Sequence, residues 1–373
     1  MKTVAIFSGY SVPHPGGIET YVARITRELN RRGIRVINIS ANYDNSKDMW
    51  RESDLLYQYR LPVYSIWKNR YPFIKHNQTY RRLMRELKSY SIDHIIVNTR
   101  FHLTSHIGAR LGRQNNIPVS LIEHGSAPLT LDNPLFDKGL DMIESMLTSH
   151  IRKNVDLVFG VSQAAVDHAD KRFRLKTGGI WYNSIDIDPN AAFPTKNSKR
   201  ITISYVGRII KQKGVDTLLA SVTELSRTYD NIRVNIVGDG PCLEELKSTF
   251  KAPNIQFHGR LSQEEVRKID LKTDIFVYAP NHPEGLPSAI LEAGLAGCAV
   301  IGSPQGGIKE IIVDKKNGLI VNGTVKDLVA KLKTLIDNPK LRVELAKRLY
   351  DDIANKFSTK KVVDRILADL KIE

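Results

Sequence analysis

The sequence predicts an α/β protein made of two parallel-sheet domains. With 373 residues the chain is longer than one hydrophobic core comfortably supports. In each half, short apolar runs typical of buried strands alternate with amphipathic stretches typical of helices. Residues 186–200 are rich in Asn, Asp, Pro, Thr, Lys and Ser, which is the composition of a linker. We therefore expect two Rossmann-like domains that face each other across a cleft.

The first domain is expected to span residues 1–185. Residues 4–7 have the composition of a buried strand, and a helix is expected from about Ile18 to Arg32 because apolar residues recur there at helical spacing. A second strand at residues 35–39 completes a βαβ unit. The remaining elements are predicted as strands at residues 94–97, 119–122, 155–161 and 180–182, and as helices at 138–153 and 164–172.

The second domain is expected to span residues 201–354 and to repeat the alternation of strands and helices. Its strands are predicted at residues 201–206, 232–237, 255–258, 275–279, 299–301 and 319–321, with helices notably at 214–229 and 243–250. The Lys-rich tail carries no strand signal. Its end, residues 355–373, is expected to form a helix that packs back on the first domain.

The composition is that of an ordinary soluble globular protein, with 42% hydrophobic and 25% charged residues. Cys242 and Cys298 lack metal-ligand spacing, so we expect no disulfide framework, no zinc site and a reducing cytoplasm. The chain has no run of about 18 apolar residues, and its first residues lead straight into a strand-like segment. We therefore expect neither a membrane span nor a signal peptide.

The net charge of +15 is the unusual feature of the composition, and the cationic excess is larger in the first half. It peaks at Arg60, Lys68, Arg70, Lys75, Arg81, Arg82, Arg85 and Lys88, among which aromatic residues are interleaved. This mixture suits an anionic membrane surface, a nucleic acid or a plain solvated basic face. No nucleic-acid recognition module is evident, so residues 57–90 are the candidate contact with an anionic membrane, at its inner face.

Two carboxylates lie eight residues apart across a predicted loop-to-helix junction, Glu284 in the loop and Glu292 inside the helix. The junction itself is Gly285-Leu286-Pro287-Ser288, and a proline suits the first turn of a helix. At helical rise the two carboxylates would be about 12 Å apart, which one extended ligand could span. The free N–H groups at the start of such a helix attract phosphate.

Two further loops have the composition of phosphate-binding loops. Gly16 and Gly17 follow the first strand and open the first helix, where glycine lets the backbone approach a ligand. Neither the G-x-G-x-x-G spacing nor the Walker lysine pattern is present. Arg208 and Lys213 follow the first strand of the second domain, and two cations there could clamp a diphosphate.

Three more stretches bear on the site. His124 ends a strand of the first domain, where it could donate a hydrogen bond to a sugar hydroxyl or take part in proton transfer, since a histidine titrates near neutrality. Arg260 and Leu261 follow another strand and could meet a base through their backbone, although a plain turn is equally consistent. Asp186-Ile187-Asp188 spells the D-x-D of metal-dependent sugar transferases, but it precedes Pro189 in the linker, so we interpret it as linker.

Taken in order along nearly the whole chain, these stretches resemble the family-4 retaining glycosyltransferases, also called group 1 glycosyltransferases, which have the GT-B fold. Glu284 and Glu292 match the family's E-x7-E motif. The other matching stretches are the glycine loop at residues 16–19, the phosphate-binding stretch at 207–214, and residues 237–241 and 302–307.

The resemblance implies that a sugar is transferred from a nucleotide sugar, most simply a UDP- or GDP-sugar, to a saccharide or lipid-linked acceptor. It further implies retention of anomeric configuration and no metal or other cofactor. Arg208 and Lys213 would bind the diphosphate, and Glu284 would contact the transferred sugar. The remaining implied roles are Glu292 on the ribose, Gly17 beside the donor phosphate, His124 near the donor sugar, and the backbone of Arg260 and Leu261 at the base.

Other functions remain open from the residues alone. A glycoside hydrolase would use Glu284 and Glu292 as acid and nucleophile, but it needs carboxyls about 5 to 9.5 Å apart. A nucleotide-sugar epimerase shares the same architecture. The high net charge also leaves a basic nucleic-acid-binding protein as a non-enzyme alternative. The donor sugar, its base and the acceptor depend on pocket geometry that the sequence does not reveal.

Overall fold

The computed structural model describes residues 1–14, 16–64, 72–128, 134–196 and 200–372. The chain forms two compact units, unit 1 from Met1–Asp186 with Thr359–Glu373, and unit 2 from Ile187–Ser358. Both units are α/β with mostly parallel sheets, which confirms the predicted fold class. Within the described residues, no helix is long and apolar enough to cross a membrane.

Unit 1 is built on a nine-stranded sheet in the order β3-β4-β2-β1-β6-β7-β8-β9, with β5 paired to β4. All pairs are parallel except β3 with β4 and β4 with β5. Most strands are continuous apolar runs because helices cover both faces of the sheet. The strands are β1 (Thr3–Phe7), β2 (Arg35–Asn42), β3 (Met49–Ser53), β4 (Leu56–Tyr64), β5 (Phe73–Ile74), β6 (His94–Asn98), β7 (Val119–Glu123), β8 (Leu157–Gly160) and β9 (Thr177–Ile180).

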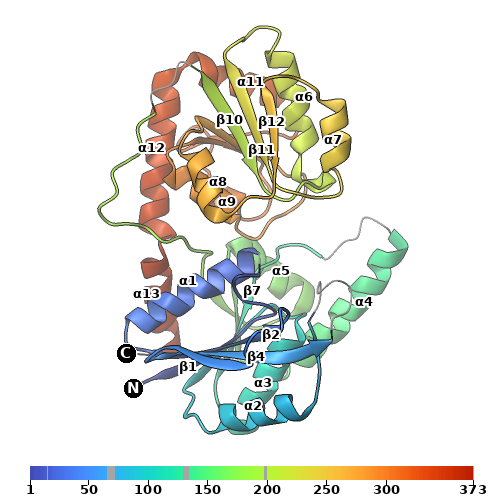
Figure 1. Cartoon of the computed structure of the whole chain (residues 1–373), viewed down its shortest axis with the longest axis vertical. Helices are drawn as coiled ribbons and strands as arrows, with labels where there is room; N and C mark the ends of the chain where they lie inside the picture. Colours follow the sequence, from blue (N-terminus) through green and yellow to red (C-terminus); the bar gives the residue numbers. More distant parts are fainter. Residues whose placement is uncertain (15, 65–71, 129–133, 197–199, 373) are drawn as a thin grey trace. The chain divides into compact units, whose positions relative to one another are not determined.

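The helices of unit 1 divide between the two faces of the sheet, with α1 and α13 on one face and α2 and α3 on the other (Figure 1). The second face carries a core that joins Phe7, Ile39 and Leu61 of the sheet to Leu83 of α2 and Ala109 of α3. The helices are α1 (Gly17–Arg31), α2 (Gln78–Lys88), α3 (Leu103–Asn115), α4 (Pro134–Ile151), α5 (Gln163–Phe173) and α13 (Thr359–Leu370).

Helix α13 packs on unit 1 although it ends the chain. Arg32 Nη2 lies 2.7 Å from Asp364 Oδ1, and Trp181 Nε1 donates to Asp369 Oδ2 over 2.9 Å. Trp181 is fully buried and stacks on Phe159 with ring centroids 3.8 Å apart. Helix α13 therefore contacts the residues that follow β9 in unit 1; residues 355 and 356, which the sequence assigned to the same helix, belong to α12.

Strand β4 departs from the sequence interpretation of residues 57–90 as one basic aromatic surface. Tyr59 is 1% exposed and Arg60 is 4% exposed, because β4 lies inside the sheet beside β2. These two residues cannot reach a membrane, so the surface interpretation is wrong for this part of the segment. Lys68 and Arg70, which also belonged to that prediction, lie outside the described residues.

Unit 2 is built on a fully parallel sheet in the order β12-β11-β10-β13-β14-β15. Every strand therefore ends at the same edge. The strands are β10 (Ile201–Val206), β11 (Ile232–Val237), β12 (Ile255–Gly259), β13 (Ile275–Tyr278), β14 (Ala299–Gly302) and β15 (Leu319–Ile320). In the linker, Lys196 Nζ donates to the carbonyl oxygen of Asp270 over 3.3 Å, so this part of the linker belongs to unit 2.

Helices surround the sheet of unit 2, and α12 runs along one side of it (Figure 1). The helices are the 3₁₀ turn η2 (Lys211–Lys213), α6 (Val215–Leu225), α7 (Leu243–Thr249), α8 (Gln263–Asp270), α9 (Ser288–Leu295), α10 (Ile308–Ile311), α11 (Val325–Asp337) and α12 (Pro339–Lys356). Because β10, β12, β13 and β14 run parallel, the loops that follow them gather the predicted residues of the second domain at one edge.

Candidate active site

A cation, a carboxylate and a phenol meet where the parallel strands of unit 2 end. Lys213 ends η2, which follows β10, and Glu284 lies in the loop after β13. Lys213 Nζ is 2.5 Å from Glu284 Oε1 and 2.8 Å from Tyr278 Oη. The charged side chains are 14% and 21% exposed, so water screens their attraction only partly. The structure brings together Lys213, one of the two residues assigned to the diphosphate, and Glu284, which was assigned to the transferred sugar.

Tyr278 is a member of this cluster that the sequence reasoning missed. Its ring lies 5.2 Å from Lys213 Nζ, which is a cation–π distance. Burial raises the pKa of Tyr278 well above 10, and the charge and hydrogen bond of Glu284 raise it further. The phenol therefore remains protonated and orients both charged partners. The only signal in the sequence was its place at the end of a predicted strand.

The backbone of Glu284 is held by the loop that follows β14. Gly307 N donates to the carbonyl oxygen of Glu284 over 2.9 Å. Gly306 has φ +52°, and a Cβ at this position would overlap that same carbonyl. Glycine is therefore required at residue 306 by both its conformation and its contact. This explains why the glycine-rich stretch at residues 302–307 accompanies the glutamate loop.

Arg208 stands on a backbone that is fixed by its neighbours, while its own side chain is exposed. The Tyr205 hydroxyl donates to the carbonyl oxygen of Arg208 over 2.8 Å. Gly238 has φ +138°, and a Cβ there would overlap the carbonyl oxygen of Gly207. The loops after β10 and β11 thus pack backbone to backbone, and they present the Arg208 guanidinium to solvent.

The start of α9 has the form that the sequence predicted. Leu286 and Pro287 are buried, and the helix begins at Ser288 without a side-chain cap on its first N–H groups. Glu292 is half-buried one turn further along. Burial and, to a smaller extent, the charge of Glu292 together raise the pKa of Asp270 to about 7, while Lys196 opposes the shift. Glu292 therefore lies close enough to the end of α8 to influence a buried carboxyl there.

Arg260 and Leu261 occupy a short, well-fixed turn between β12 and α8. The carbonyl oxygen of Gly259 accepts a hydrogen bond from Gly238 N over 2.8 Å, which ties the end of β12 to the loop that follows β11. Immediately after the turn, Ser262 and Glu265 form a reciprocal capping box at the start of α8. Arg260 is exposed and Leu261 is partly buried. These hydrogen bonds hold the turn on both sides.

In unit 1 the glycine loop lies at the start of α1. A Cβ on Gly16 would overlap the Glu19 carboxylate, so a larger residue there would displace this side chain. A Cβ on Gly17 would meet no described atom within 4 Å, so packing does not require glycine there. Burial raises the pKa of Glu19, but the hydrogen bond from His14 and nearby positive charge bring it below its ordinary value. The open space over Gly17 remains for a ligand.

His124 follows β7, as predicted, but its charge state differs from the expectation. Burial lowers the pKa of His124 to about 4, so the ring is neutral near pH 7 and does not titrate there. Asn98 Nδ2 donates to the carbonyl oxygen of Phe7 over 3.1 Å, which turns Asn98 Oδ1 toward His124 Nε2 at 3.0 Å. Nε2 then carries the proton, and Nδ1 is the acceptor. The predicted titration near neutrality is wrong because the ring is buried.

A buried ionic triad lies behind the strand that carries His124. The Arg100 guanidinium bridges the carboxylates of Glu123, at the end of β7, and Glu144, on α4, and all three are at most 2% exposed. Arg100 also lies 4.1 Å from the centre of the Phe173 ring. Glu123 Oε1 accepts from Gly125 N over 3.1 Å, so the triad fixes the turn at His124. Sequence reasoning missed this cluster because its members are distant in the chain.

The Asp186-Ile187-Asp188 sequence has a structural role. Arg27 Nη2 lies 2.9 Å from Asp186 Oδ2, and Thr359 Oγ1 donates to Asp186 Oδ1 over 2.7 Å. Asp188 Oδ1 accepts from Asn190 N over 2.9 Å. Across the part of the chain that the structure describes, no three His, Cys, Asp or Glu residues gather closely enough to hold a metal ion.

Comparison with family models and curated proteins gives matches along most of the chain. Residues 15–189 match the model of Glycosyltransferase Family 4, and residues 186–352 match that of Glycosyl transferases group 1. An uncharacterized glycosyltransferase of Methanocaldococcus jannaschii is 27% identical, over 96% of this chain and 95% of its own. One component of the human phosphatidylinositol N-acetylglucosaminyltransferase is 24% identical, over 97% of this chain and 76% of its own.

Solved structures share the fold. The HepE protein of Anabaena, crystallised in complex with UDP-glucose, superposes with a TM-score of 0.74 at 15% identity, and the match covers 100% of both chains. At this identity the likeness shows the fold, which is GT-B. Together the two family models match residues 15–189 and 186–352. The chain belongs to the family-4, group 1 glycosyltransferases.

Proposed function

We propose that this glycosyltransferase moves a sugar from a UDP- or GDP-sugar to a saccharide or lipid-linked acceptor, with retention of anomeric configuration and without a metal. Two of the proteins that resemble it support this proposal. The human relative acts on phosphatidylinositol by its name, and the Anabaena neighbour binds UDP-glucose. The proposed setting is the cytoplasm, at the inner face of the membrane, in the synthesis of cell-surface polysaccharide or glycolipid.

The contact between Lys213 and Glu284 is the observation that carries the proposal. Lys213 is held by a carboxylate 2.5 Å away, and a diphosphate arriving at this edge offers it a more highly charged partner. Exchange of partners would place the cation on the leaving group and free Glu284 to accept a hydrogen bond from the sugar. One ion pair thereby prepares the site for both ends of the bond that breaks.

The remaining unit 2 residues would bind the rest of the donor. Arg208 shares the diphosphate with Lys213, and the first N–H groups of α9, which begins at Ser288 after the turn at residues 285–287, point their positive ends toward negative charge. Glu292 accepts hydrogen bonds from the ribose hydroxyls. The backbone of Arg260 and Leu261 meets the base. Because two cations neutralise the diphosphate, the reaction proposed here does not need a metal to stabilise the leaving group.

Unit 1 would contribute its glycine loop and His124. The open space over Gly17 lets backbone N–H groups approach the donor phosphate. Neutral His124 accepts a hydrogen bond from a sugar hydroxyl at Nδ1, because its Nε2 proton is bound by Asn98. In the proposed front-face reaction a donor phosphate oxygen takes the acceptor proton as the new bond forms. No separate protein nucleophile is then needed.

The reaction can be tested by following the anomeric proton of the product by NMR in the presence of EDTA. We expect an acceptor-dependent product with the donor's anomeric configuration and an unchanged rate after chelation. An inverted product would contradict the retaining mechanism. Loss of activity with EDTA, restored by Mg²⁺ or Mn²⁺, would contradict the metal-independent site. Cleavage of an aryl glycoside without any nucleotide would favour a hydrolase instead.

A further inference from the structure

Helices α2 and α3 of unit 1 border a groove that the proposed transfer reaction does not use. Its volume is about 620 Å³, which is within the range of small-molecule sites. The floor is formed by Ile74, Met84, Leu103, Ile107 and Leu111. Met84, Leu103 and Ile107 are only partly buried, because one side of each packs against the core and the other lines the groove. The groove therefore offers a continuous apolar floor.

The rim of the groove is cationic. Arg81, Arg85 and Lys88 come from α2, and Arg110 comes from α3. Among the described residues that line the groove, none carries a carboxylate. Arg82, between two of these cations in the sequence, differs from them because it lies 3.0 Å from Glu86 and 3.3 Å from Asp48. The groove therefore suits a ligand that combines an apolar part with an anionic group.

Helix α4 extends the same surface. Its Met142 is 72% exposed and its Met146 is 64% exposed, and they lie one turn apart on one side of the helix. One turn further, His150 Nε2 lies 3.2 Å from Arg110 Nη2, and its ring stacks near His106, which lines the groove. An exposed apolar stripe therefore leads to the cationic rim, and such stripes mark interaction surfaces.

We propose that this groove binds an anionic phospholipid of a membrane. One acyl chain lies on the apolar floor, and the phosphate is bound by Arg81, Arg85 and Arg110. The exposed methionines of α4 enter the same lipid layer. A bilayer is the partner that offers acyl chains and a high density of anionic phosphate together, whereas a soluble sugar phosphate would leave the floor empty. This proposal goes beyond the transfer reaction and does not depend on it.

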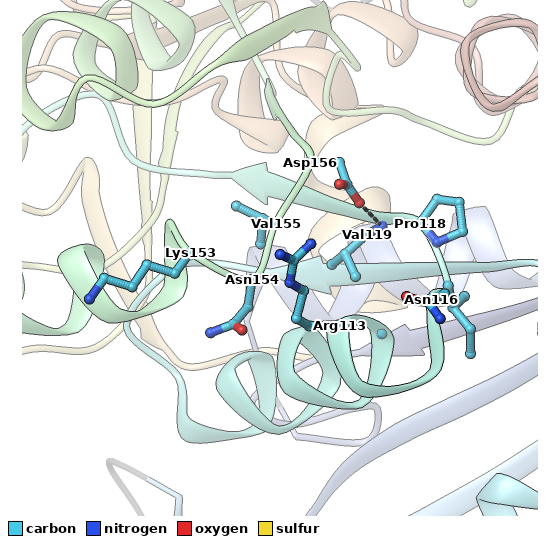
Figure 2. Close-up of a pocket in the computed structure, with 10 residues that line it drawn as sticks. Arg113, Asn116, Pro118, Val119, Lys153, Asn154, Val155 and Asp156 are labelled. Carbon is cyan, nitrogen blue, oxygen red and sulfur yellow. Dashed lines mark hydrogen bonds between the residues drawn. The ribbon is translucent and has the colours of Figure 1, made fainter.

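The first test compares two double variants with the same change in net charge. Arg85→Glu with Arg110→Glu alters the groove. Arg82→Glu with Arg113→Glu is the control. Arg82 is ion-paired, and Arg113 of α3 lies near Asn154 and lines a separate cavity (Figure 2). Binding is measured by sedimentation with vesicles of phosphatidylglycerol and phosphatidylcholine, and with phosphatidylcholine alone, without any nucleotide sugar.

We expect the wild-type chain to bind the anionic vesicles and not those of phosphatidylcholine alone. The groove variant should bind at least about 25-fold more weakly, because each cation near an anionic surface contributes about fivefold. The control variant should stay within about threefold of wild type, because Arg82 is ion-paired and neither Arg82 nor Arg113 lines the groove. An equal loss in both variants, or equal binding to both kinds of vesicle, would overturn the proposal.

The second test concerns the apolar floor. Ile107→Trp fills the groove, and Met84→Gln makes the floor polar at nearly constant volume, so a folding defect in one does not decide the result. Both should weaken vesicle binding about tenfold or more while the chain remains folded in a thermal melt. Binding that persists in both variants overturns the proposal. So does competition by glycerol 3-phosphate as effective as that by dihexanoyl phosphatidylglycerol, because it would indicate a free-phosphate site.

Discussion

Replacing Glu284 by Gln should separate donor binding from turnover. The substitution keeps the size of the side chain but removes the charge that holds Lys213 Nζ at 2.5 Å. In the wild-type chain a diphosphate must compete with this carboxylate for the lysine. In the variant the competition is weaker, so UDP or GDP should bind equally well or more tightly. The transferred sugar, in contrast, loses a charged acceptor.

The size of the effect follows from the geometry of the pair. A hydrogen bond to a charged group contributes about 1.5 to 3 kcal/mol. The side chains of Lys213 and Glu284 are 14% and 21% exposed, and Gln can still accept one hydrogen bond. We therefore expect the nucleotide to bind more tightly by at most about 1 kcal/mol, or about fivefold. Turnover should fall by about 100-fold or more, which is the usual cost of one preorganised contact to a transition state.

Calorimetric titration with UDP and GDP gives the affinity, and product formation at saturating donor gives kcat. Lys213→Met is the matched control, since it removes the other half of the pair and should weaken nucleotide binding instead. The reasoning is refuted if Glu284→Gln weakens nucleotide binding as strongly as Lys213→Met does. It is also refuted if Glu284→Gln leaves kcat unchanged.

Four further outcomes are expected. Glu292→Gln should weaken nucleotide binding by about tenfold with a smaller effect on kcat; equal losses would contradict its ribose role. Because burial lowers the pKa of His124 to about 4, His124→Asn should leave the pH–rate profile between pH 5.5 and 8 unchanged in shape. The pKa of Asp270 is raised from an ordinary value of 3.8 to about 7 in the folded chain, so the free energy of unfolding decreases as the pH rises between these two values. Asp270→Asn should therefore stabilise the chain at pH 8 more than at pH 4 in urea titrations. Arg100→Met removes the cation that bridges two buried carboxylates and should cost about 3 to 5 kcal/mol in the same titrations.

The parallel-sheet architecture could be predicted because its signals are local. Apolar runs such as Ile275–Tyr278 and Ile201–Val206 are long enough to identify buried strands, and parallel strands end at one edge. The loops after them carry glycines whose conformation is locally encoded. Arg208, Lys213 and Glu284 could therefore be assigned to one edge from the sequence alone.

Residues that act through distant partners could not be predicted. In the sequence nothing distinguishes Arg100, Glu123 and Glu144 from other charged residues, and only the folded chain buries them together. Strand β4 was missed because Tyr59 and Arg60 belong to a basic aromatic stretch whose charge hides its alternating pattern. The charge state of His124 depends on its burial, and the spacing of residues in the sequence does not indicate whether a loop residue is buried.

Thermal stabilisation by nucleotide sugars tests the donor site most directly, because a ligand that binds only the folded chain raises the melting temperature. The wild-type chain and Lys213→Met are melted with UDP-, GDP-, ADP- and dTDP-sugars. We expect a shift with a UDP- or GDP-sugar in the wild-type chain and a much smaller shift in Lys213→Met. No shift with any of the four classes, or an equal shift in both proteins, would contradict a donor site at Lys213 and Glu284.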